Sequence, residues 1–197
     1  MESGVLYPEI AFHMSAKSVT LLDILKEQKA SKYSGGIYHK TQIDLTYYSN
    51  HIEGSRMTHD QPRYIFETST IGVEKEVLNV DDVIETANHF CCIDMIIDHA
   101  KAALTEKFIK ELHLVLKNGT SDSRKDWYAV GDYEKLPNEV GGMDTALPEE
   151  VADKMKTLLT EYSVKEEKTF ENGSSEEKYL HTVSKEKQSW ETCLLFP

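Results

Sequence analysis

Apolar residues recur at helical spacing along most of the chain, and this period predicts a mainly α-helical fold. In the first half of the chain the pattern predicts four helices, over residues 15–31, 39–53, 58–69 and 81–99. Two more are predicted over residues 105–117 and 148–162. No internal repeat is visible, so the sequence indicates one helical unit rather than an array of repeats.

The second predicted helix carries an apolar stripe and ends at a glycine. The stripe consists of Ile43, Leu45, Tyr48 and Ile52. Gly54 is a natural stop, because glycine readily adopts the left-handed conformation that terminates many helices.

Polar residues and prolines mark the starts of the other helices. Thr58, Asp81 and Thr105 stand at or directly before a periodic segment, so we expect each to cap its helix. Pro62 must then lie in or near the first turn of the third helix, where its missing N–H costs no hydrogen bond. Pro148 and the acids that follow it suit the start of the last helix for the same reason.

Residues 124–142 depart from the helical period. The stretch reads RKDWYAVGDYEKLPNEVGG, in which aromatic and β-branched residues are interrupted by glycine and proline. This composition favours a short β-hairpin or an ordered loop. The predicted fold class is therefore mainly α with one small β-hairpin.

Composition allows one domain and narrows the classes of partner. Hydrophobic residues make up 40% and charged residues 28% of the 197 residues, enough apolar material for a packed core. The net charge of −12 argues against a nucleic-acid partner, because phosphate binding needs clustered Lys and Arg. No apolar run is long enough for a membrane span, and the first residues do not resemble a secretory leader.

The cysteines and the chain ends complete the organisation that we expect. Cys91, Cys92 and Cys193 form neither a disulfide framework nor a zinc ligand set, so we expect a cytoplasmic protein without a metal site of its own. Residues 1–14 have no clear period and are expected to be an N-terminal extension to a domain over 15–170. Residues 171–197 lose the helical texture, and we expect a divergent, disordered tail there.

Four stretches of the domain resemble the Fic (Fido) family, whose members transfer AMP from ATP onto protein hydroxyls. They are SNHIEG at 49–54, TEKFIKELHLVLKNGTSD at 105–122, WYAVGDYEKLPNEVGG at 127–142 and LPEEVADKMKTLL at 147–159. In order, they are similar to the family's inhibitory helix, the helix before its flap hairpin, the flap, and the next helix. The resemblance implies a Fic-like helical domain over about 15–170, with an inhibitory helix at about 40–54 and a flap at about 124–142.

The resemblance gives Ser49, Glu53 and Gly54 an inhibitory role. The family pattern is Ser or Thr, three residues, Glu, and then Gly or Asn. It implies that Glu53 binds the arginine that would otherwise hold the γ-phosphate of ATP, while Ser49 supports the helix against the same loop. Without the resemblance, Ser49 and Glu53 would be a solvated pair four residues apart, worth a few tenths of a kcal/mol.

The resemblance also makes the flap a site for a target protein. It implies that the flap pairs with the backbone of the target by strand addition, with Trp127, Tyr128, Val130 and Gly131 as the contacts. The alternative is a surface hairpin held by aromatic packing. His113 in KELHL is a base by residue type, but we interpret it as structural because the family's base lies elsewhere.

AMP transfer in the family depends on a loop that this sequence does not contain. That loop reads His-Pro-Phe, one residue, Asp or Glu, Gly-Asn-Gly-Arg, two residues and a second Arg. Its His is the base, its acid binds Mg²⁺, its glycines admit the phosphates and its second Arg holds the γ-phosphate. Gly-Asn-Gly occurs nowhere in the chain, and the only His in the expected region is His181.

A shift of reading frame would account for this segment. His181 to Ser184 can be encoded by CAT ACC GTT TCA, and loss of one A yields His-Pro-Phe. Gln188 to Cys193, with suitable codons, yields Arg-Val-Gly-Arg-Leu one base later, which has the spacing of the two motif arginines. We therefore predict a frameshift at or just after His181, which makes His181 a remnant of the catalytic His in a truncated domain.

These expectations leave three functional hypotheses. By lineage the chain is an autoinhibited adenylyltransferase that uses ATP and Mg²⁺ and modifies a Ser, Thr or Tyr hydroxyl of a protein substrate. By its residues it is an inactive product that does not bind ATP productively, and truncation would expose apolar faces of 81–99 and 148–162 and favour aggregation. The alternative is a non-enzymatic module that acts on a partner through the inhibitory helix or the flap. The target, the transferred group and any homo-oligomer stay open.

Overall fold

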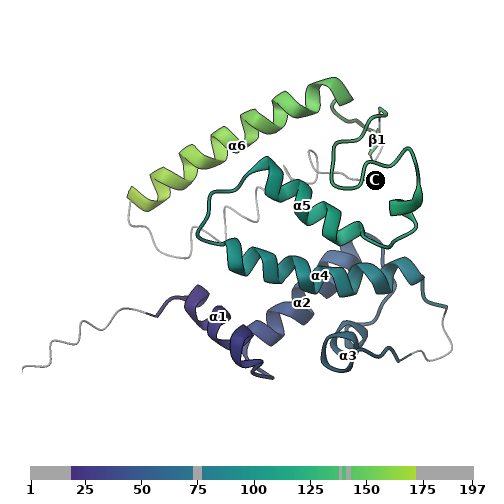
Figure 1. Ribbon diagram of the computed structural model, residues 1–197, viewed down its shortest axis with the longest axis vertical. Coiled ribbons are helices and arrows are strands. Elements are labelled where there is room, and N and C mark those ends of the chain that lie inside the picture. Colours follow the sequence, from purple (N-terminus) through teal and green to yellow (C-terminus); the bar gives the residue numbers. More distant parts are fainter. Residues whose placement is uncertain (1–18, 73–76, 138, 141–142, 172–197) are drawn as a thin grey trace, which may run out of the picture.

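The computed structural model describes residues 19–72, 77–137, 139–140 and 143–171, with side chains left undescribed at 139–140, 143–144 and 166–171. The elements are α1 (Leu21–Ser31), α2 (Ile37–Ile52), α3 (Asp60–Thr68), α4 (Val80–His99), α5 (Glu106–Lys117), the 3-10 turn η1 (Asp122–Arg124), β1 (Glu139–Val140), β2 (Met143–Asp144) and α6 (Pro148–Glu171). The predicted mainly helical fold class is confirmed (Figure 1). The predicted extension over 1–14 and the tail beyond residue 171 lie outside the described residues.

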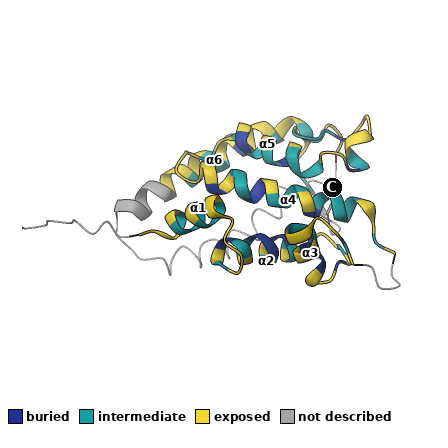
Figure 2. Ribbon diagram, turned by 60° about the horizontal axis from the view of Figure 1, so that its bottom comes forward, coloured by how far each residue is buried: buried dark blue, intermediate teal, exposed yellow. Residues whose placement is uncertain are grey.

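Helix α4 is the common support of the fold. It contacts α1, α2 and α3 on one side and α5 on the other. Figure 1 shows this order, with α6 beyond α5 as the outermost helix, and in Figure 2 α5 and α6 overlap above α4 while α2 and α3 lie below it. Helix α2, which carries the SNHIEG segment, also contacts α1 and α3 directly.

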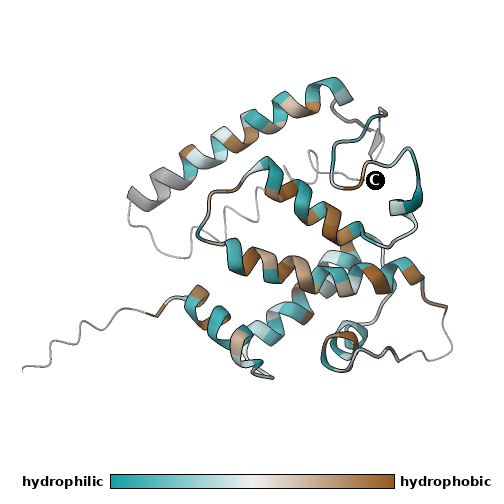
Figure 3. Ribbon diagram, viewed as in Figure 1, coloured by the Kyte–Doolittle hydropathy of each residue, from teal (hydrophilic) through white to brown (hydrophobic). Residues whose placement is uncertain are grey.

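The core lies where α1, α2 and α3 meet α4. Its buried members are Tyr38, Ile93 and Ile97, and half-buried side chains from α1 and α3 pack against them. The Phe66 ring of α3 lies edge-on to the ring of Phe90, with centroids 4.9 Å apart. Figure 3 shows brown, hydrophobic stretches along α4. Each fully buried aliphatic side chain of this kind is worth roughly 1.5–3 kcal/mol.

Two of the predicted helix starts are confirmed. The Thr105 side chain accepts a hydrogen bond from the Phe108 N–H and caps α5. Helix α6 begins at Pro148, and Glu149 and Glu150 follow in its first turn, where acids suit the helix dipole.

Three other starts differ from the prediction. Helix α1 begins at Leu21, because Thr20 forms a capping box with Asp23 and fixes the start there. Helix α4 is capped by Asn79 rather than by Asp81, whose carboxylate is used elsewhere. Thr58 does not cap α3 with its side chain; instead its N–H donates to Gln61.

The apolar stripe predicted for α2 is wrong on three of its four positions. Leu45, Tyr48 and Ile52 are 46%, 59% and 54% exposed, and only Ile43 is buried. The side that faces α4 carries Tyr38, Gln42, Thr46 and Asn50, all buried and spaced by four residues. A periodicity analysis misses this side because three of its members are polar.

The predicted exposure of apolar faces is largely wrong. Within 148–162 no large apolar side chain is exposed, and Met155 is buried. Within 81–99, Ile96 is the one large apolar side chain that is exposed. Among the described helices, α2 instead carries the most exposed large apolar side chains, namely Ile37, Leu45, Tyr48 and Ile52.

The hairpin forms later in the chain than predicted and is very short. Strands β1 and β2 are antiparallel, with Glu139 opposite Asp144 and Val140 opposite Met143. Residues 127–137 form turns without strand pairing. We keep the name flap segment for residues 127–144, which covers these turns and both strands.

Candidate functional site

The SNHIEG motif forms the C-terminal end of α2, and its glycine completes a helix cap. Glu53 is the capping residue, and Gly54 has φ of +90°. The Gly54 N–H donates to the His51 carbonyl at 3.1 Å, and the Ser55 N–H donates to the Asn50 carbonyl at 3.0 Å. These two bonds are those of a Schellman motif, which requires a left-handed residue at the position of Gly54. The predicted glycine stop is confirmed.

The two side chains for which the family resemblance implies an inhibitory role, Ser49 and Glu53, are not bonded to each other. Glu53 is exposed, and among the described residues its carboxylate has no hydrogen bond or ion pair. Ser49 is half-buried, and its carbonyl accepts the Glu53 N–H at 3.3 Å. The cap therefore presents the Glu53 carboxylate to solvent from a fixed helix end.

Three side-chain contacts hold this end of α2 on the first half of α4. Asn50 Nδ2 donates to Thr86 Oγ1 at 2.8 Å, and both residues are buried. Thr86 Oγ1 in turn contacts the sulfur of the buried Met57 at 3.2 Å. After the cap, Ser55 Oγ donates to Asp82 Oδ2 at 2.9 Å. The position of Glu53 is therefore determined by polar contacts on both sides of it.

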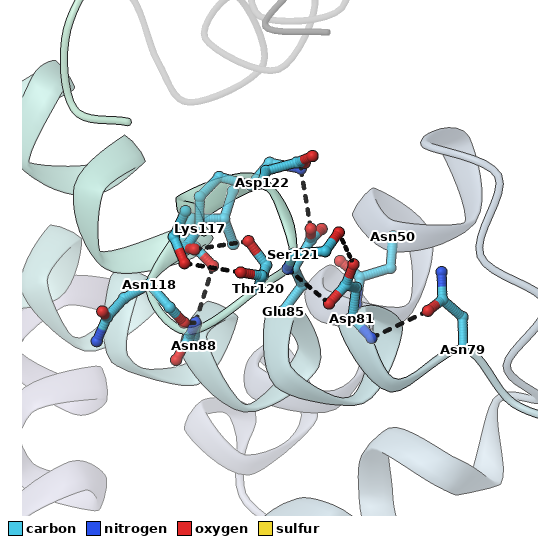
Figure 4. Close-up of polar contacts among 12 residues, drawn as sticks. Asn50, Asn79, Asp81, Glu85, Asn88, Lys117, Asn118, Thr120, Ser121 and Asp122 are labelled. Atoms are coloured by element: carbon cyan, nitrogen blue, oxygen red, sulfur yellow. Dashed lines mark hydrogen bonds and ion pairs between the residues drawn. The ribbon is translucent and has the colours of Figure 1, made fainter. Parts of the chain in front are cut away.

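A second polar cluster lies on the same half of α4, where α5 ends (Figure 4). Lys117 Nζ lies 2.9 Å from Glu85 and 3.6 Å from Asp122. The Asp81 carboxylate accepts the Ser121 N–H at 2.9 Å and also the Ser121 hydroxyl. These contacts fix the chain between α5 and the flap segment.

Asn88 closes the same cluster at the end of α5. Its Nδ2 donates to the carbonyls of Leu116 and Asn118 at 2.8 and 2.9 Å. The last carbonyls of a helix lack intrahelical partners, so this side chain acts as a cap supplied by α4. Figure 4 shows Asn88 below the end of α5, with Lys117 and Thr120 beside it.

The charges of this cluster are shifted by burial and by their partners. The hydrogen bond from the Ser121 hydroxyl lowers the pKa of Asp81. Burial raises the pKa of the Glu85 carboxyl, although Lys117 counteracts it. Burial also opposes the charge on Lys117, but the hydrogen bond and charge of Glu85 outweigh this and raise the Lys117 pKa. The cluster is a partly buried ion pair supported by hydrogen bonds.

The predicted target contacts in the flap segment lie in different environments. Trp127 is 53% exposed, whereas Tyr128 is 7% exposed. Val130 is half-buried, and Gly131 has φ of +74°. A Cβ at Gly131 would lie 2.8 Å from Leu114 Cβ, so both space and backbone angle demand glycine there.

The turn around Gly131 rests on α5. The Gly131 N–H donates to His113 Nδ1 at 3.0 Å, and His113 is buried. Burial and the nearby Lys117 charge lower the pKa of His113 to about 4. Lys110 pairs with Asp132 at 2.8 Å and lies 3.9 Å from the centre of the Tyr133 ring. His113 is thus a structural support of the turn, as the sequence interpretation had it.

The predicted catalytic remnant, His181, lies outside the described residues. Within the described ranges no three His, Cys, Asp or Glu side chains are grouped so that they could hold a metal ion. The three arginines of the sequence are Arg56, Arg63 and Arg124, so none follows residue 124. None of the helices in the described part of the chain has the length and apolarity needed to cross a bilayer.

The fold is similar to that of a Fic domain containing signaling protein from Bacteroides thetaiotaomicron VPI-5482. The TM-score is 0.57 at 25% sequence identity, and the match covers 75% of this chain and 57% of that chain. No protein-family model matches the chain, and no curated protein is significantly similar to it. The likeness supports a relation to the Fic family and shows a Fic-like helical fold. The chain spans little more than half of that protein, so the likeness does not establish an activity for this chain.

The sequence analysis missed the residues that anchor both segments on α4. The sequence pattern predicts Asp81 as a cap and assigns no role to Asp82, Ser55, Ser121 and Lys117. One signal was available, since the sequence places two adjacent acids at a helix start, and adjacent helical positions point about 100° apart. Which segment each acid would meet depends on the tertiary arrangement.

Proposed function

We propose that this chain is a relative of the Fic protein adenylyltransferases that keeps the inhibitory end of α2 but, in these 197 residues, carries no phosphate-binding loop and transfers no AMP. The observation that carries the proposal is the SNHIEG segment itself. Within a Fic-like fold it forms a glycine-capped helix end that presents the Glu53 carboxylate to solvent.

The inhibitory role of Glu53 follows from the chemistry of carboxylates and guanidinium groups. A carboxylate on a fixed helix end can form a paired, charge-assisted hydrogen bond with an arginine and so exclude a phosphate from it. Asn50 and Ser55 hold this end of α2 on α4. Such a held end competes better than a mobile one, because the backbone of the segment is already ordered before Glu53 pairs.

The residues present do not fit a site for Mg²⁺ and ATP. Phosphoryl chemistry needs donors for the developing charge and a metal on the phosphates. The sequence has neither Gly-Asn-Gly nor an arginine after Arg124, and the described residues offer no metal-ligand cluster. His181, even as a base, would have no positioned phosphate to act with.

As a contact for a target protein, we favour Trp127 over Tyr128. Trp127 presents an exposed ring beside the turn, and Lys125 Nζ lies 5.2 Å from the centre of that ring. The buried Tyr128 instead supports the turn from beneath. The partner implied by the family is a protein with a free hydroxyl, bound along this segment.

The direct test is incubation of the purified chain with labelled ATP, Mg²⁺ and a cell lysate. We expect no transfer of label by the 197-residue chain and none by the Glu53→Gln variant, because the loop that would bind ATP is missing. Label transfer by either protein would overturn the inactive part of the proposal.

The inhibitory part is tested on a chain repaired by a one-base shift directly after codon 181, which keeps His181. If the shifted frame encodes the phosphate loop, we expect the repaired chain to transfer AMP weakly and its Glu53→Gln variant strongly. Glu27→Gln, an exposed acid on α1, is the matched control and should leave transfer unchanged. Equal transfer with and without Glu53 would remove the inhibitory role.

The second candidate function is regulation of a partner, in which Glu53 is donated to an intact Fic protein. The observation in its favour is that the Glu53 carboxylate has no partner among the described residues, beside the exposed Tyr48 and Ile52. Titration calorimetry with an intact Fic protein tests it. Binding that Glu53→Gln weakens and Glu27→Gln does not would support this role, and absence of binding would exclude it.

A further inference from the structure

Two adjacent acids at the start of α4 bind the two functional segments separately. Asp82 accepts the Ser55 hydroxyl at 2.9 Å, directly after the SNHIEG cap. Asp81 accepts the Ser121 N–H at 2.9 Å and the Ser121 hydroxyl, at the start of the segment that leads to the flap. One helical turn therefore serves the inhibitory end of α2 on one side and the root of the flap segment on the other.

The same division repeats one turn later. Glu85, four residues after Asp81, pairs with Lys117 at 2.9 Å. Thr86, four residues after Asp82, accepts the Asn50 amide at 2.8 Å. Residues four apart lie on one face of a helix, so the two rows are two faces of a single rigid element. Figure 4 shows Asp81 and Glu85 on the side of Ser121 and Asp122, with Asn50 approaching from the α2 side.

The first turn of α4 depends on these outside contacts for its order. The first four N–H groups of a helix have no partner within it. Here Asn79 accepts one of them, from Asp81 at 3.1 Å. Helix ends open more readily than helix centres. When the first turn of α4 loses one of its side-chain contacts, it therefore opens more often. Opening of this turn weakens its remaining contacts. The contact of Asp82 with Ser55 and that of Asp81 with Ser121 are therefore coupled, although the two serines do not touch.

We propose that Asp81 and Asp82 couple the inhibitory end of α2 to the root of the flap segment, so that release of either one loosens the other. The inference rests on the proposed function for its meaning, since it links the segment that blocks the phosphate site to the segment that holds the target. In a chain with a working loop, displacement of Glu53 and movement of the flap would then occur together.

Hydrogen exchange of the full 197-residue chain, followed by mass spectrometry, tests the coupling. Ser55→Ala removes the hydroxyl that reaches Asp82. We expect it to raise amide exchange at 53–57 and also, about two- to fivefold, at 120–124. Ser121→Ala should do the reverse and raise exchange at 53–57. In the double variant the increases should be smaller than the product of the single ones.

Ser123→Ala is the matched control, because the Ser123 hydroxyl bonds the Thr120 carbonyl within the same loop and does not contact α4. It should leave exchange at 53–57 unchanged. Asp82→Asn, which keeps the shape and removes the charge, provides a second variant for the Ser55 contact. Unchanged exchange at 120–124 in both Ser55→Ala and Asp82→Asn would overturn the coupling, and so would fully multiplicative effects. No nucleotide is involved, so this result is separate from the outcome of the labelled-ATP experiment.

Discussion

The two sides of α4 contact different kinds of side chain. Toward α2 it meets Tyr38 of the core and, beyond it, a row of buried polar side chains, in which Gln42 and Thr46 are 0% exposed. Toward α5 its own buried Cys92 and the buried Phe108 of α5 lie in an apolar contact, with the Lys117 ion pair at one end. Burial of apolar area stabilises without regard to direction, whereas hydrogen bonds stabilise only in one geometry. We infer that apolar burial dominates the contact of α4 with α5, whereas on the α2 side directional hydrogen bonds add to the core around Tyr38 and fix the position of α2.

The polar side is only partly satisfied. Gln42 Nε2 donates to Asp94 Oδ1 at 2.9 Å, and the Tyr38 hydroxyl donates to the same oxygen at 2.9 Å. Burial and this bond raise the Tyr38 pKa to about 12. The Thr46 hydroxyl has no hydrogen-bond partner among the described residues. An interface that contains both hydrogen-bonded and unpartnered buried polar groups fixes the position of α2 on α4 but contributes little net stability.

The largest expected effect comes from the apolar side. Phe108→Ala should lower the free energy of unfolding by about 3 kcal/mol, since it leaves a cavity between α4 and α5 where the ring stacks on His99. Urea unfolding at pH 7.5 measures it. Leu114→Ala on the exposed side of α5 is the control and should cost less than about 1 kcal/mol. If Phe108→Ala lowers the free energy of unfolding by no more than the control does, the interface of α4 and α5 is not held by apolar burial.

The next effect concerns pH and the histidine under the flap turn. Burial lowers the His113 pKa from 6.5 to about 4, so on acidification the unfolded chain takes up a proton before the folded chain does. The stability that His113 contributes is therefore complete above pH 6.5 and is lost as the pH falls toward 4. At pH 5 the loss should be about 2 kcal/mol.

His113→Asn separates this effect from other acid effects, because an asparagine oxygen can accept the Gly131 N–H without titrating. Urea unfolding at pH 7 and pH 5 should show a smaller decrease for the variant, by about 2 kcal/mol. Identical decreases for the two proteins would mean that His113 is not kept neutral by its surroundings.

A smaller effect is expected when the polar side loses a donor. Gln42→Met keeps the volume but removes the amide that binds Asp94 and the Phe90 carbonyl. We expect a loss of about 1–2 kcal/mol, because a hydrogen bond to a charged group disappears while Asp94 keeps Tyr38. An unchanged or raised urea midpoint would show that the row of polar groups is dispensable, which would remove the basis of the comparison.

The same contrast explains what the sequence could and could not predict. Helix α5 follows the ordinary rule that apolar positions face inward, with Phe108 buried, and its cap at Thr105 was predicted. Helix α2 breaks that rule, because polar side chains four residues apart face α4 and Leu45 and Tyr48 face solvent. A period of 3.6 finds a face only when the face is apolar.

The site shows the same limit on a smaller scale. Gly54 was predicted as a stop from its residue type alone, since the left-handed cap is a local requirement. The pairing of Asp82 with Ser55 and of Asp81 with Ser121 links residues 27 and 40 positions apart. No local rule contains such partners. The flap turns were misplaced for a related reason, since Tyr128 is buried in the turn rather than paired along a strand.

The smallest expected effect has the opposite sign and tests the polar side most directly. Thr46→Val replaces a fully buried hydroxyl that has no partner among the described residues with a methyl group of similar size. The folded chain then no longer has to desolvate a group that gains nothing in return, so we expect a gain of about 1 kcal/mol in the free energy of unfolding. Thr86→Val, one helix away, is the matched control: its hydroxyl accepts from Asn50, and its loss should destabilise instead. Equal destabilisation by both valine variants would mean that the Thr46 hydroxyl is hydrogen-bonded, which would contradict the expected gain. If the signs differ, specific hydrogen bonds such as that from Asn50 to Thr86, rather than the burial of polar groups as such, fix the end of α2 that carries Glu53 on α4.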